Sequence, residues 1–402
     1  MKKKTILVIT LLFLSIFVKT SLSLENVRNI DEKQKILYVG GHGPGNYTKI
    51  QKAINSSAVG DTVFIYNGTY FENIVVDKSI LIIGENRYNT VINGGKNGAT
   101  VTINAEEVTI SNLTITGGKK TDAKTVDNMC IAGIKTKSSN IRIIGNIIKN
   151  NSMGVFCVRS SNLTIHDNSF LNDGLTFTPY ENDGRPEIKI NYFLHSIENN
   201  TVNGKPLYYY KNSNDFIVPS DVGQLIAVNC TNMTLKNANI STCDNGILMA
   251  YCKKCTIENN SISQNGGIWT FRSCNNVFQY NNLSNNIVHG ITLDYSSNNN
   301  IIKNNLISNN AVIGVMLEWY SKNNLITKNN LISNQNRNGY QVQSFRNKWD
   351  GNYWSNWRGL TKPFFSFLPK IVYGSPIERF IQYIPPVPVN IDFHPAGKPY
   401  AI

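Results

Sequence analysis

The sequence predicts an all-β fold, a single-stranded parallel β-helix in which coils of about 22 residues stack on one another. Of the 402 residues 59 are Asn, and no long stretch has the period of an amphipathic helix, which indicates short strands joined by tight turns. A unit of this length is too short for a pair of helices. It suits one coil of a solenoid, whose rungs lie about 4.8 Å apart.

Two independent columns of residues share this period. A Gly followed by an apolar residue recurs at adjacent steps of 21, 21, 23, 24 and 25 residues, at Gly133, Gly154, Gly246, Gly267, Gly290, Gly314 and Gly339. An Asn recurs at adjacent steps of 22, 22, 22, 23 and 25 residues, at Asn146, Asn168, Asn237, Asn259, Asn281, Asn304 and Asn329. Asn tolerates left-handed corners, and its amide can form hydrogen bonds along a stack. A leucine-rich repeat has the same period, but here Val, Ile and Thr replace its Leu positions and no helical half is visible.

The ends of the chain differ from the middle, as a solenoid with covered edges requires. We expect a signal peptide at 1–23, an N-terminal cap at 24–60, a β-helix at 61–357 and a C-terminal capping tail at 358–402. The cap contains one short amphipathic helix near 48–54. Strands are expected at 62–66, 74–76, 80–83, 101–103, 108–110 and 113–115. Residues 173–223 are less regular, which predicts coils with loop insertions, and the tail is expected to be irregular.

Residues 1–23 are typical of a secretory signal, with Lys2, Lys3 and Lys4 before an apolar run at 6–18 and small residues at 21–23. An uncleaved anchor is the alternative, although the run is short for a spanning helix. We therefore expect a secreted or cell-surface protein with no transmembrane segment after cleavage. Its N-glycosylation candidates include Asn46, Asn67, Asn112, Asn162, Asn232 and Asn282.

The formal net charge is +13, and +9 without the four lysines of the signal segment. A basic exported protein is compatible with anionic polymers, cell-wall glycans or lipid head groups as neighbours. Export argues against nucleic acid as a partner. We expect a polysaccharide or a cell-surface glycan, and the sequence does not predict the oligomeric state.

Several segments resemble archaeal right-handed β-helix proteins of the NosD type. They are YVGG at 38–41, NYTKIQKAI at 46–54, GDTV at 60–63, GTY at 68–70, NTVNGKPLYY at 200–209 and WDGNYWS at 349–355. The resemblance spans nearly the whole mature chain and implies a right-handed, pectin-lyase-like β-helix. That wider group includes polysaccharide lyases, hydrolases, epimerases, adhesive surface proteins and a periplasmic factor for copper-site maturation, so the fold leaves function open.

One face of the predicted coils carries candidate site residues. If strand residues alternate, Asp294 and Glu318 point outward on adjacent rungs and are candidates for catalysis. The candidates for substrate binding around them are Trp269, Phe271, Arg272, His289, Tyr295 and Trp319. The competing interpretation is a solvated surface whose acidic pair is offset by Arg272. The calcium cluster of lyases and the three-Asp pattern of pectin hydrolases are not recognisable.

The seven cysteines are Cys130, Cys157, Cys230, Cys243, Cys252, Cys255 and Cys274. Cys230, Cys252 and Cys274 are 22 residues apart, which predicts a ladder of small residues in one turn column; a disulfide between coils and a metal site are the alternatives. We expect no cofactor, since copper or calcium rests on the family resemblance alone. The sequence thus favours a non-catalytic carbohydrate-binding or structural protein. A polysaccharide lyase or glycoside hydrolase on acidic polysaccharide, and a NosD-like copper-site factor, are the alternatives.

Overall fold

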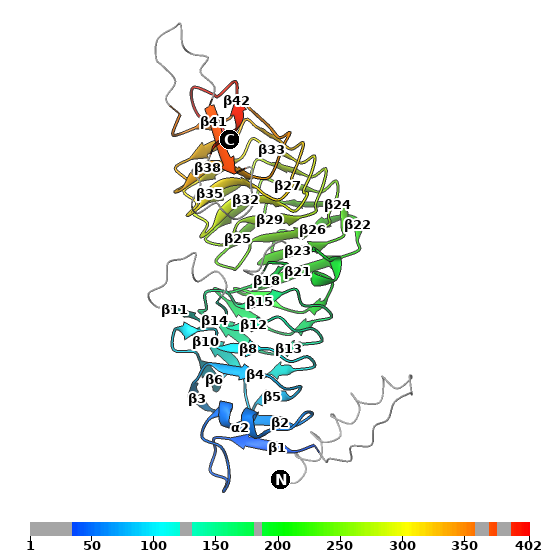
Figure 1. Ribbon diagram of the computed structural model, residues 1–402, viewed down its shortest axis with the longest axis vertical. Coiled ribbons are helices and arrows are strands. Elements are labelled where there is room, and N and C mark those ends of the chain that lie inside the picture. The colour runs from blue at the N-terminus through cyan, green and yellow to red at the C-terminus, as the bar shows by residue number, and fades with distance from the viewer. Residues whose placement is uncertain (1–33, 121–130, 181–186, 358–369, 376–386) are drawn as a thin grey trace. The chain divides into compact units, whose positions relative to one another are not determined.

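The computed structural model describes residues 34–120, 131–180, 187–357, 370–375 and 387–402. In these residues short parallel strands stack rung on rung, and the predicted parallel β-helix is confirmed (Figure 1). A complete coil contributes three strands, which we assign to faces 1, 2 and 3 in their order along the coil. Among the described residues, no helix has both the length and the apolar character needed to cross a bilayer.

The strands of each face are as follows. Face 1 contains β4 (Ile74–Val76), β8 (Val101–Ile103), β12 (Ile134–Thr136), β15 (Val155–Val158), β18 (Leu175–Thr178), β21 (Lys205–Lys211), β23 (Gln224–Val228), β26 (Ile247–Ala250), β29 (Ile268–Phe271), β32 (His289–Asp294), β35 (Ile313–Leu317), β38 (Arg337–Val342) and β41 (Lys370–Ser375). Face 2 contains β1 (Ile36–Val39), β2 (Thr62–Ile65), β5 (Leu81–Gly84), β9 (Thr109–Ser111), β13 (Arg142–Ile144), β16 (Thr164–His166), β19 (Ser196–Glu198), β22 (Asn214–Val218), β24 (Thr231–Lys236), β27 (Thr256–Glu258), β30 (Val277–Gln279), β33 (Ile301–Lys303), β36 (Leu325–Thr327), β39 (Lys348–Asp350) and β42 (Val387–Asp392). Face 3 contains β3 (Gly68–Phe71), β6 (Thr90–Asn93), β10 (Thr114–Thr116), β14 (Ile147–Lys149), β17 (Ser169–Leu171), β20 (Thr201–Val202), β25 (Asn239–Ser241), β28 (Ser261–Ser263), β31 (Asn282–Ser284), β34 (Leu306–Ser308), β37 (Asn330–Ile332) and β40 (Tyr353–Trp354). The short pair β7 (Asn97–Gly98) and β11 (Lys119–Lys120) is antiparallel and lies outside the faces.

The core consists of apolar side chains that repeat at the same strand position in successive coils. On face 2 one such file runs through Ile257, Phe278, Ile302, Ile326 and Trp349, each at most 1% exposed. Their neighbours along the strands alternate toward solvent, as a period of two requires. The expected strand positions at 62–66, 74–76, 80–83, 101–103, 108–110 and 113–115 agree with the structure to within one residue at each end.

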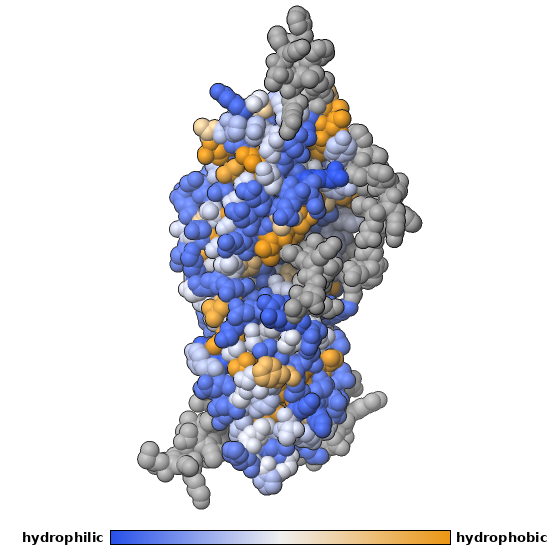
Figure 2. Space-filling model, turned by 90° about the vertical axis from the view of Figure 1, so that its left-hand side faces the viewer, coloured by the Kyte–Doolittle hydropathy of each residue, from blue (hydrophilic) through white to orange (hydrophobic). Residues whose placement is uncertain are grey.

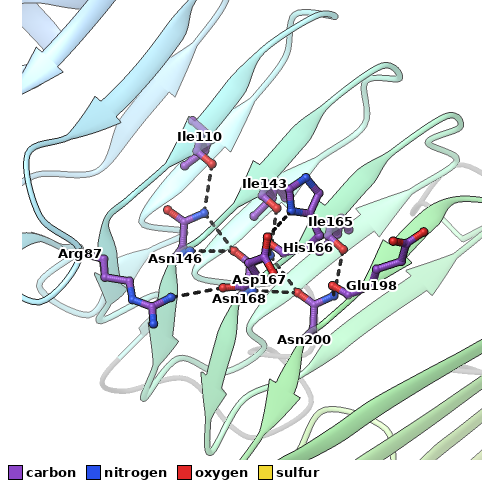
Figure 3. Close-up of polar contacts among 10 residues, drawn as sticks. All are labelled: Arg87, Ile110, Ile143, Asn146, Ile165, His166, Asp167, Asn168, Glu198 and Asn200. Atoms are coloured by element: carbon purple, nitrogen blue, oxygen red, sulfur yellow. Dashed lines mark hydrogen bonds and ion pairs between the residues drawn. The ribbon is translucent and has the colours of Figure 1, made fainter. Parts of the chain in front are cut away.

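Ladders of buried Asn side chains hold the corners of the coils together. Asn281 donates its side-chain amide to the Ile257 carbonyl at 2.8 Å, and its main-chain N–H to Asn305 Oδ1 at 2.9 Å. The same pattern links Asn146, Asn168 and Asn200 in the earlier coils (Figure 3). After the irregular segment this ladder contains Asn260, Asn281, Asn305, Asn329 and Asn352.

The predicted Asn column is therefore partly wrong in register. Asn237, Asn259 and Asn304 lie one residue before the ladder, where each adopts left-handed backbone, with φ of 58°, 53° and 52°. The predicted column merged two adjacent files, because Asn-Asn pairs place an Asn in both. The file at the corner is set by left-handed backbone, and the buried file is set by hydrogen bonding.

A short helix covers the start of the stack. Helix α2 (Ile50–Ser56) packs against β1, β2 and β4 through Ile50, Ala53 and Ile54, which are fully buried. The Glu72 carboxylate accepts hydrogen bonds from the main-chain N–H groups of Ile50 and Gln51 at 2.9 and 3.1 Å. It thereby satisfies two donors at the helix start that have no partner within the helix.

At the other end, strands β41 and β42 extend the last coil. They pair antiparallel with each other, while β41 also pairs with β38 and β42 with β39. Part of the tail expected to be irregular is therefore regular strand; residues 358–369 and 376–386 lie outside the described residues. The buried Asp392 carboxylate accepts from Asn352 and from Trp354 Nε1, and so ends the Asn ladder.

The stack changes between β18 and β23, within the segment predicted to be less regular. The chain leaves the coil after β18, forms the short 3-10 helix η1 (Ile190–Tyr192), and then makes an antiparallel hairpin with β20 and β21. There a side chain joins the β18 and β23 strands of face 1. Gln224 accepts from the Leu175 N–H at 3.0 Å and donates to the Leu175 carbonyl at 2.9 Å, which replaces a main-chain rung.

Candidate functional site

The register of face 1 places the two carboxyl candidates on adjacent rungs. Phe271 lies opposite Asp294 in the register of β29 and β32. Leu293 lies opposite Leu317, so the next residues, Asp294 and Glu318, are neighbours on adjacent rungs. Strand alternation alone therefore positions the two residues side by side, with their main chains about one rung spacing apart.

Asp294 is fully buried and accepts three hydrogen bonds. Its Oδ2 accepts from the Tyr180 hydroxyl and from Trp269 Nε1 (3.2 Å), and its Oδ1 accepts from the Tyr295 N–H (2.8 Å). These donors favour the charged carboxylate, but loss of water around it has the larger effect and raises the pKa of Asp294 to about 7.

Glu318 is half-buried beside this carboxylate. Burial, followed by the negative charge of Asp294, raises its pKa well above the usual value for Glu. Two neighbouring carboxyl groups with raised pKa values hold at least one proton between them near neutral pH. The pair can therefore donate a proton as well as accept one.

The aromatic residues around the pair form a packed layer. The Tyr180 ring stacks on Trp269 with centroids 5.9 Å apart and planes 11° apart. Phe271 is 0% exposed beneath Phe193 and Tyr180, at centroid distances of 5.2 and 6.1 Å. The expectation that Phe271 contacts a substrate is therefore wrong in this structure, because the segment that follows β18 covers it.

The Arg272 main chain lies beside Asp294, but its side chain points elsewhere. The Arg272 guanidinium lies over the Tyr251 ring at 5.8 Å, so the predicted role of offsetting the acidic pair is not what its side chain does. His289 begins strand β32, five residues before Asp294. Its Nδ1 is buried without a hydrogen-bond partner, and burial lowers the pKa of the ring to about 4, so the imidazole is neutral.

The residues that follow the face-1 strands have an unusual backbone. In the described residues 37 non-Gly positions have positive φ, and 18 of them are Asn, so Asn is the usual occupant of a left-handed corner. Tyr251, Arg272, Tyr295 and Trp319 instead occupy this corner in four successive coils, with φ of 58°, 47°, 44° and 45°. We call these four residues the aromatic strip. Left-handed backbone costs most L-residues about 1–2 kcal/mol, so local preference does not account for their identity.

The aromatic strip presents planar groups one rung apart. The rings of Tyr295 and Trp319 stack with centroids 6.0 Å apart, and Arg272 lies over Tyr251. Arg272 is exposed and Tyr251 and Trp319 are half-buried, whereas Tyr295 is only 8% exposed. Tyr320, beside Trp319, is 38% exposed. Figure 2 shows one face of the molecule, largely hydrophilic, with hydrophobic residues gathered in separate patches.

Tyr180 is the main site residue that sequence reasoning missed. It reaches Asp294 from the segment after β18, 114 residues away in the sequence, and it belongs to no repeated column. Tyr251 was also missed, although its alignment with Arg272 and Tyr295 in the repeat could have identified it. The main-chain bonds from Tyr251 N to Phe271 O and from Arg272 N to Asp294 O show this alignment.

The predicted cysteine column is correct for two of its three members. Cys230 and Cys252 share a column that continues as Ser273, Ser297 and Ser321. Cys274 instead pairs with Lys253, one residue later. The six described cysteines are free thiols, and Cys130 lies outside the described residues. Nowhere in the described chain do three His, Cys, Asp or Glu side chains converge as a metal site would require.

Comparison with known proteins supports the architecture. A family model, the right handed beta helix region, matches residues 195–353. Similar solved structures include the A-module of the mannuronan C-5 epimerase AlgE6 from Azotobacter vinelandii, with 14% identity over 75% of this chain and 87% of that one and a TM-score of 0.29. The polygalacturonase of Erwinia carotovora has 12% identity over 81% of this chain and 96% of that one, with a TM-score of 0.33. The GH136 lacto-N-biosidase of Eubacterium ramulus has 12% identity over 78% of this chain and 67% of that one, with a TM-score of 0.34.

No curated protein matches the chain. Similarity to solved structures at this level carries no argument about activity. The strand register and the family match together identify the solenoid as a right-handed parallel β-helix.

Proposed function

We propose that the protein is exported and binds a carbohydrate polymer along the aromatic strip, without catalysing a reaction on it. The observation that carries the proposal is the occupation of four successive left-handed corners by Tyr, Arg, Tyr and Trp, where Asn would be less strained. The same corner carries Asn212 and Asn229 in the two coils before this row and Gln343 in the coil after it, and strained backbone of this kind is typical of a functional surface. Aromatic faces pack against the apolar faces of sugars, and Arg272 adds a donor for their acidic or hydroxyl groups.

Replacing Trp319 by Asn separates binding from folding. We expect Trp319→Asn to reduce retention on glycan arrays at least tenfold, because the exposed end of the strip loses its ring. Asn relieves strain of about 1 kcal/mol at φ 45° but gives up the ring stacked on Tyr295, so we expect the variant to fold with a lower unfolding temperature. Array retention and thermal unfolding measure the two effects.

Tyr280 provides the matched control. It occupies a left-handed corner with φ 56° in the column of Asn237, Asn259 and Asn304, away from the strip, and is 51% exposed. We expect Tyr280→Asn to fold with unchanged retention. Equal losses of binding in both variants would contradict the strip as the site, as would the absence of any retained glycan with the unchanged protein.

The carboxyl pair favours a second candidate, a polysaccharide lyase or glycoside hydrolase acting on acidic polysaccharide. Glu318 is half-buried and has a raised pKa, as a general acid requires. Asp294 is buried under Tyr180, so in this arrangement it orients its neighbours and does not touch a substrate. For this candidate, release of unsaturated or reducing ends from acidic polysaccharides must disappear in Glu318→Gln. A lack of release from every polymer tested would remove it.

A further inference from the structure

Three cysteines lie at one corner of the stack, between faces 1 and 2. Cys230 lies between β23 and β24, and Cys252 and Cys255 lie between β26 and β27 in the next coil. The Lys253 N–H donates to the Cys230 carbonyl at 2.9 Å, and Thr231 bridges to Lys253, which places Cys230 directly beside Cys252. All three cysteines are 0% exposed.

The later coils show what this corner ordinarily requires. In the column of Cys252, Ser273 donates its hydroxyl to the Phe271 carbonyl at 3.1 Å and accepts from the Cys252 N–H at 3.0 Å. In the column of Cys255 the following residues are Asn276, Asn300, Asn324 and Asn347, linked by the same ladder of amide bonds. Ser and Asn hydrogen-bond more strongly than a thiol. Hydrogen bonding therefore does not explain why Cys stands at these three positions of the two columns.

The thiols share one environment. The Cys252 thiol donates to the Ala227 and Ala250 carbonyls at 3.3 and 3.5 Å, and its position beside Cys230 lowers the pKa of Cys230 to about 7. Burial raises the pKa of Cys252, so Cys252 keeps its proton while Cys230 ionises. A thiolate beside a second thiol on the adjacent rung is the arrangement that thiol–disulfide exchange uses.

We propose that Cys230 and Cys252 are a site of covalent modification, where a disulfide closes between adjacent coils by exchange with a low-molecular-weight disulfide. A parallel rung spacing of about 4.8 Å lies within the range of Cα separations that a disulfide spans. One thiol attacks the small disulfide and releases one small thiol; the second protein thiol then displaces the other. The two cysteines lose two electrons and two protons, and the small disulfide becomes two thiols.

The bond would lie at the first two regular coils after the irregular segment. There β23 and β26 pair directly, while Gln224 replaces a main-chain rung to β18 on the other side. A covalent link here ties the start of the regular stack to the following coil. This role does not depend on carbohydrate binding, so either proposal can fail without the other.

The test is to incubate the full chain with oxidised glutathione at pH 8 until the thiol count is constant. The protein is then unfolded, alkylated with N-ethylmaleimide, digested with trypsin and mapped by mass spectrometry. We expect one tryptic peptide pair joined through Cys230 and Cys252, with the loss of two alkylatable thiols. Trypsin can cut at Lys253 and Lys254, so a bond between Cys252 and Cys255 gives a different peptide pair and would overturn the assignment. Full alkylation of Cys230 and Cys252 would overturn it as well.

Two variants keep the result interpretable. Cys252→Ser introduces the residue that the same column carries at Ser273, so we expect it to fold and to lose the crosslink. Cys255→Asn introduces the residue that its own column carries at Asn276, and we expect it to fold and keep the crosslink. A crosslink to Cys230 that survives in Cys252→Ser would contradict the proposal.

Discussion

Asn305→Ala is expected to destabilise the fold by about 2 to 6 kcal/mol. Asn305 is fully buried and donates to the Phe278 carbonyl (2.9 Å) and to Asn329 Oδ1 (2.9 Å). It also accepts from the main-chain N–H of Asn281 (2.9 Å). Removal of the side chain leaves a buried N–H and a buried C=O without partners, and each costs about 1–3 kcal/mol. Thermal and urea unfolding followed by circular dichroism measure the loss.

Asn304→Ala is the matched control for this prediction. Asn304 is the adjacent residue, half-buried, with left-handed backbone at φ 52°. Its replacement loses only the preference of Asn for this conformation, which we expect to cost about 1 kcal/mol. A loss in Asn304→Ala equal to or greater than that in Asn305→Ala would show that the corner, and not the buried ladder, stabilises the stack.

The contrast between these two residues shows how far the sequence could predict the fold. A period of about 22 residues and strand alternation were sufficient to predict that Asp294 and Glu318 lie on adjacent rungs. The same pattern could not distinguish Asn304 from Asn305, because both positions favour Asn for different physical reasons. Likewise Cys252 and Cys274 have the correct spacing, yet coils of unequal length shift their register by one residue.

The parts of the site that could not be predicted come from outside the repeat. Tyr180 and Phe193 belong to the segment that crosses face 1 after β18, and its path follows no period. Burial of Phe271 and Asp294 therefore depends on long-range packing. The strained corners were also not predictable, since Tyr251, Arg272, Tyr295 and Trp319 contradict the local preference for Asn.

Stability is expected to fall by about 2 to 4 kcal/mol between pH 6.5 and pH 8. Burial raises the pKa of Asp294 to about 7 and raises the pKa values of Glu318 and Asp244 well above their usual range. In the unfolded chain these acids are already ionised at pH 6.5, so unfolding there releases protons. Raising the pH therefore favours the unfolded chain until each group has ionised in the folded state.

Two buried histidines act in the opposite direction on the acidic side, where they lower the stability of the fold. Burial lowers the pKa values of His195 and His289 to about 4, so between pH 4 and 6.5 the unfolded chain binds protons that the folded chain does not. For each histidine, this lowering of the pKa corresponds to a loss of about 3 kcal/mol in the free energy of unfolding on acidification. This loss opposes the gain from the raised acids over the same range. The histidines of the unfolded chain lose their protons as the pH rises through about 6.5. Above this range only the acids change the free energy of unfolding.

Glu318→Gln tests the assignment of the alkaline decline. The variant removes one carboxyl group with a raised pKa and also the negative charge that faces Asp294. Glu318 and Asp294 together cause part of the fall in the free energy of unfolding between pH 6.5 and pH 8, and we expect the variant to remove at least half of that part. Urea unfolding at half-unit steps of pH measures it, with exposed Glu107→Gln as the control that leaves the profile unchanged. A protein that gains stability from pH 6.5 to pH 8 would contradict the burial of protonated carboxyl groups on face 1. If the free energy of unfolding of Glu318→Gln falls with pH as steeply as that of the unchanged protein, the fall comes from another group, and Asp244 is the next to replace.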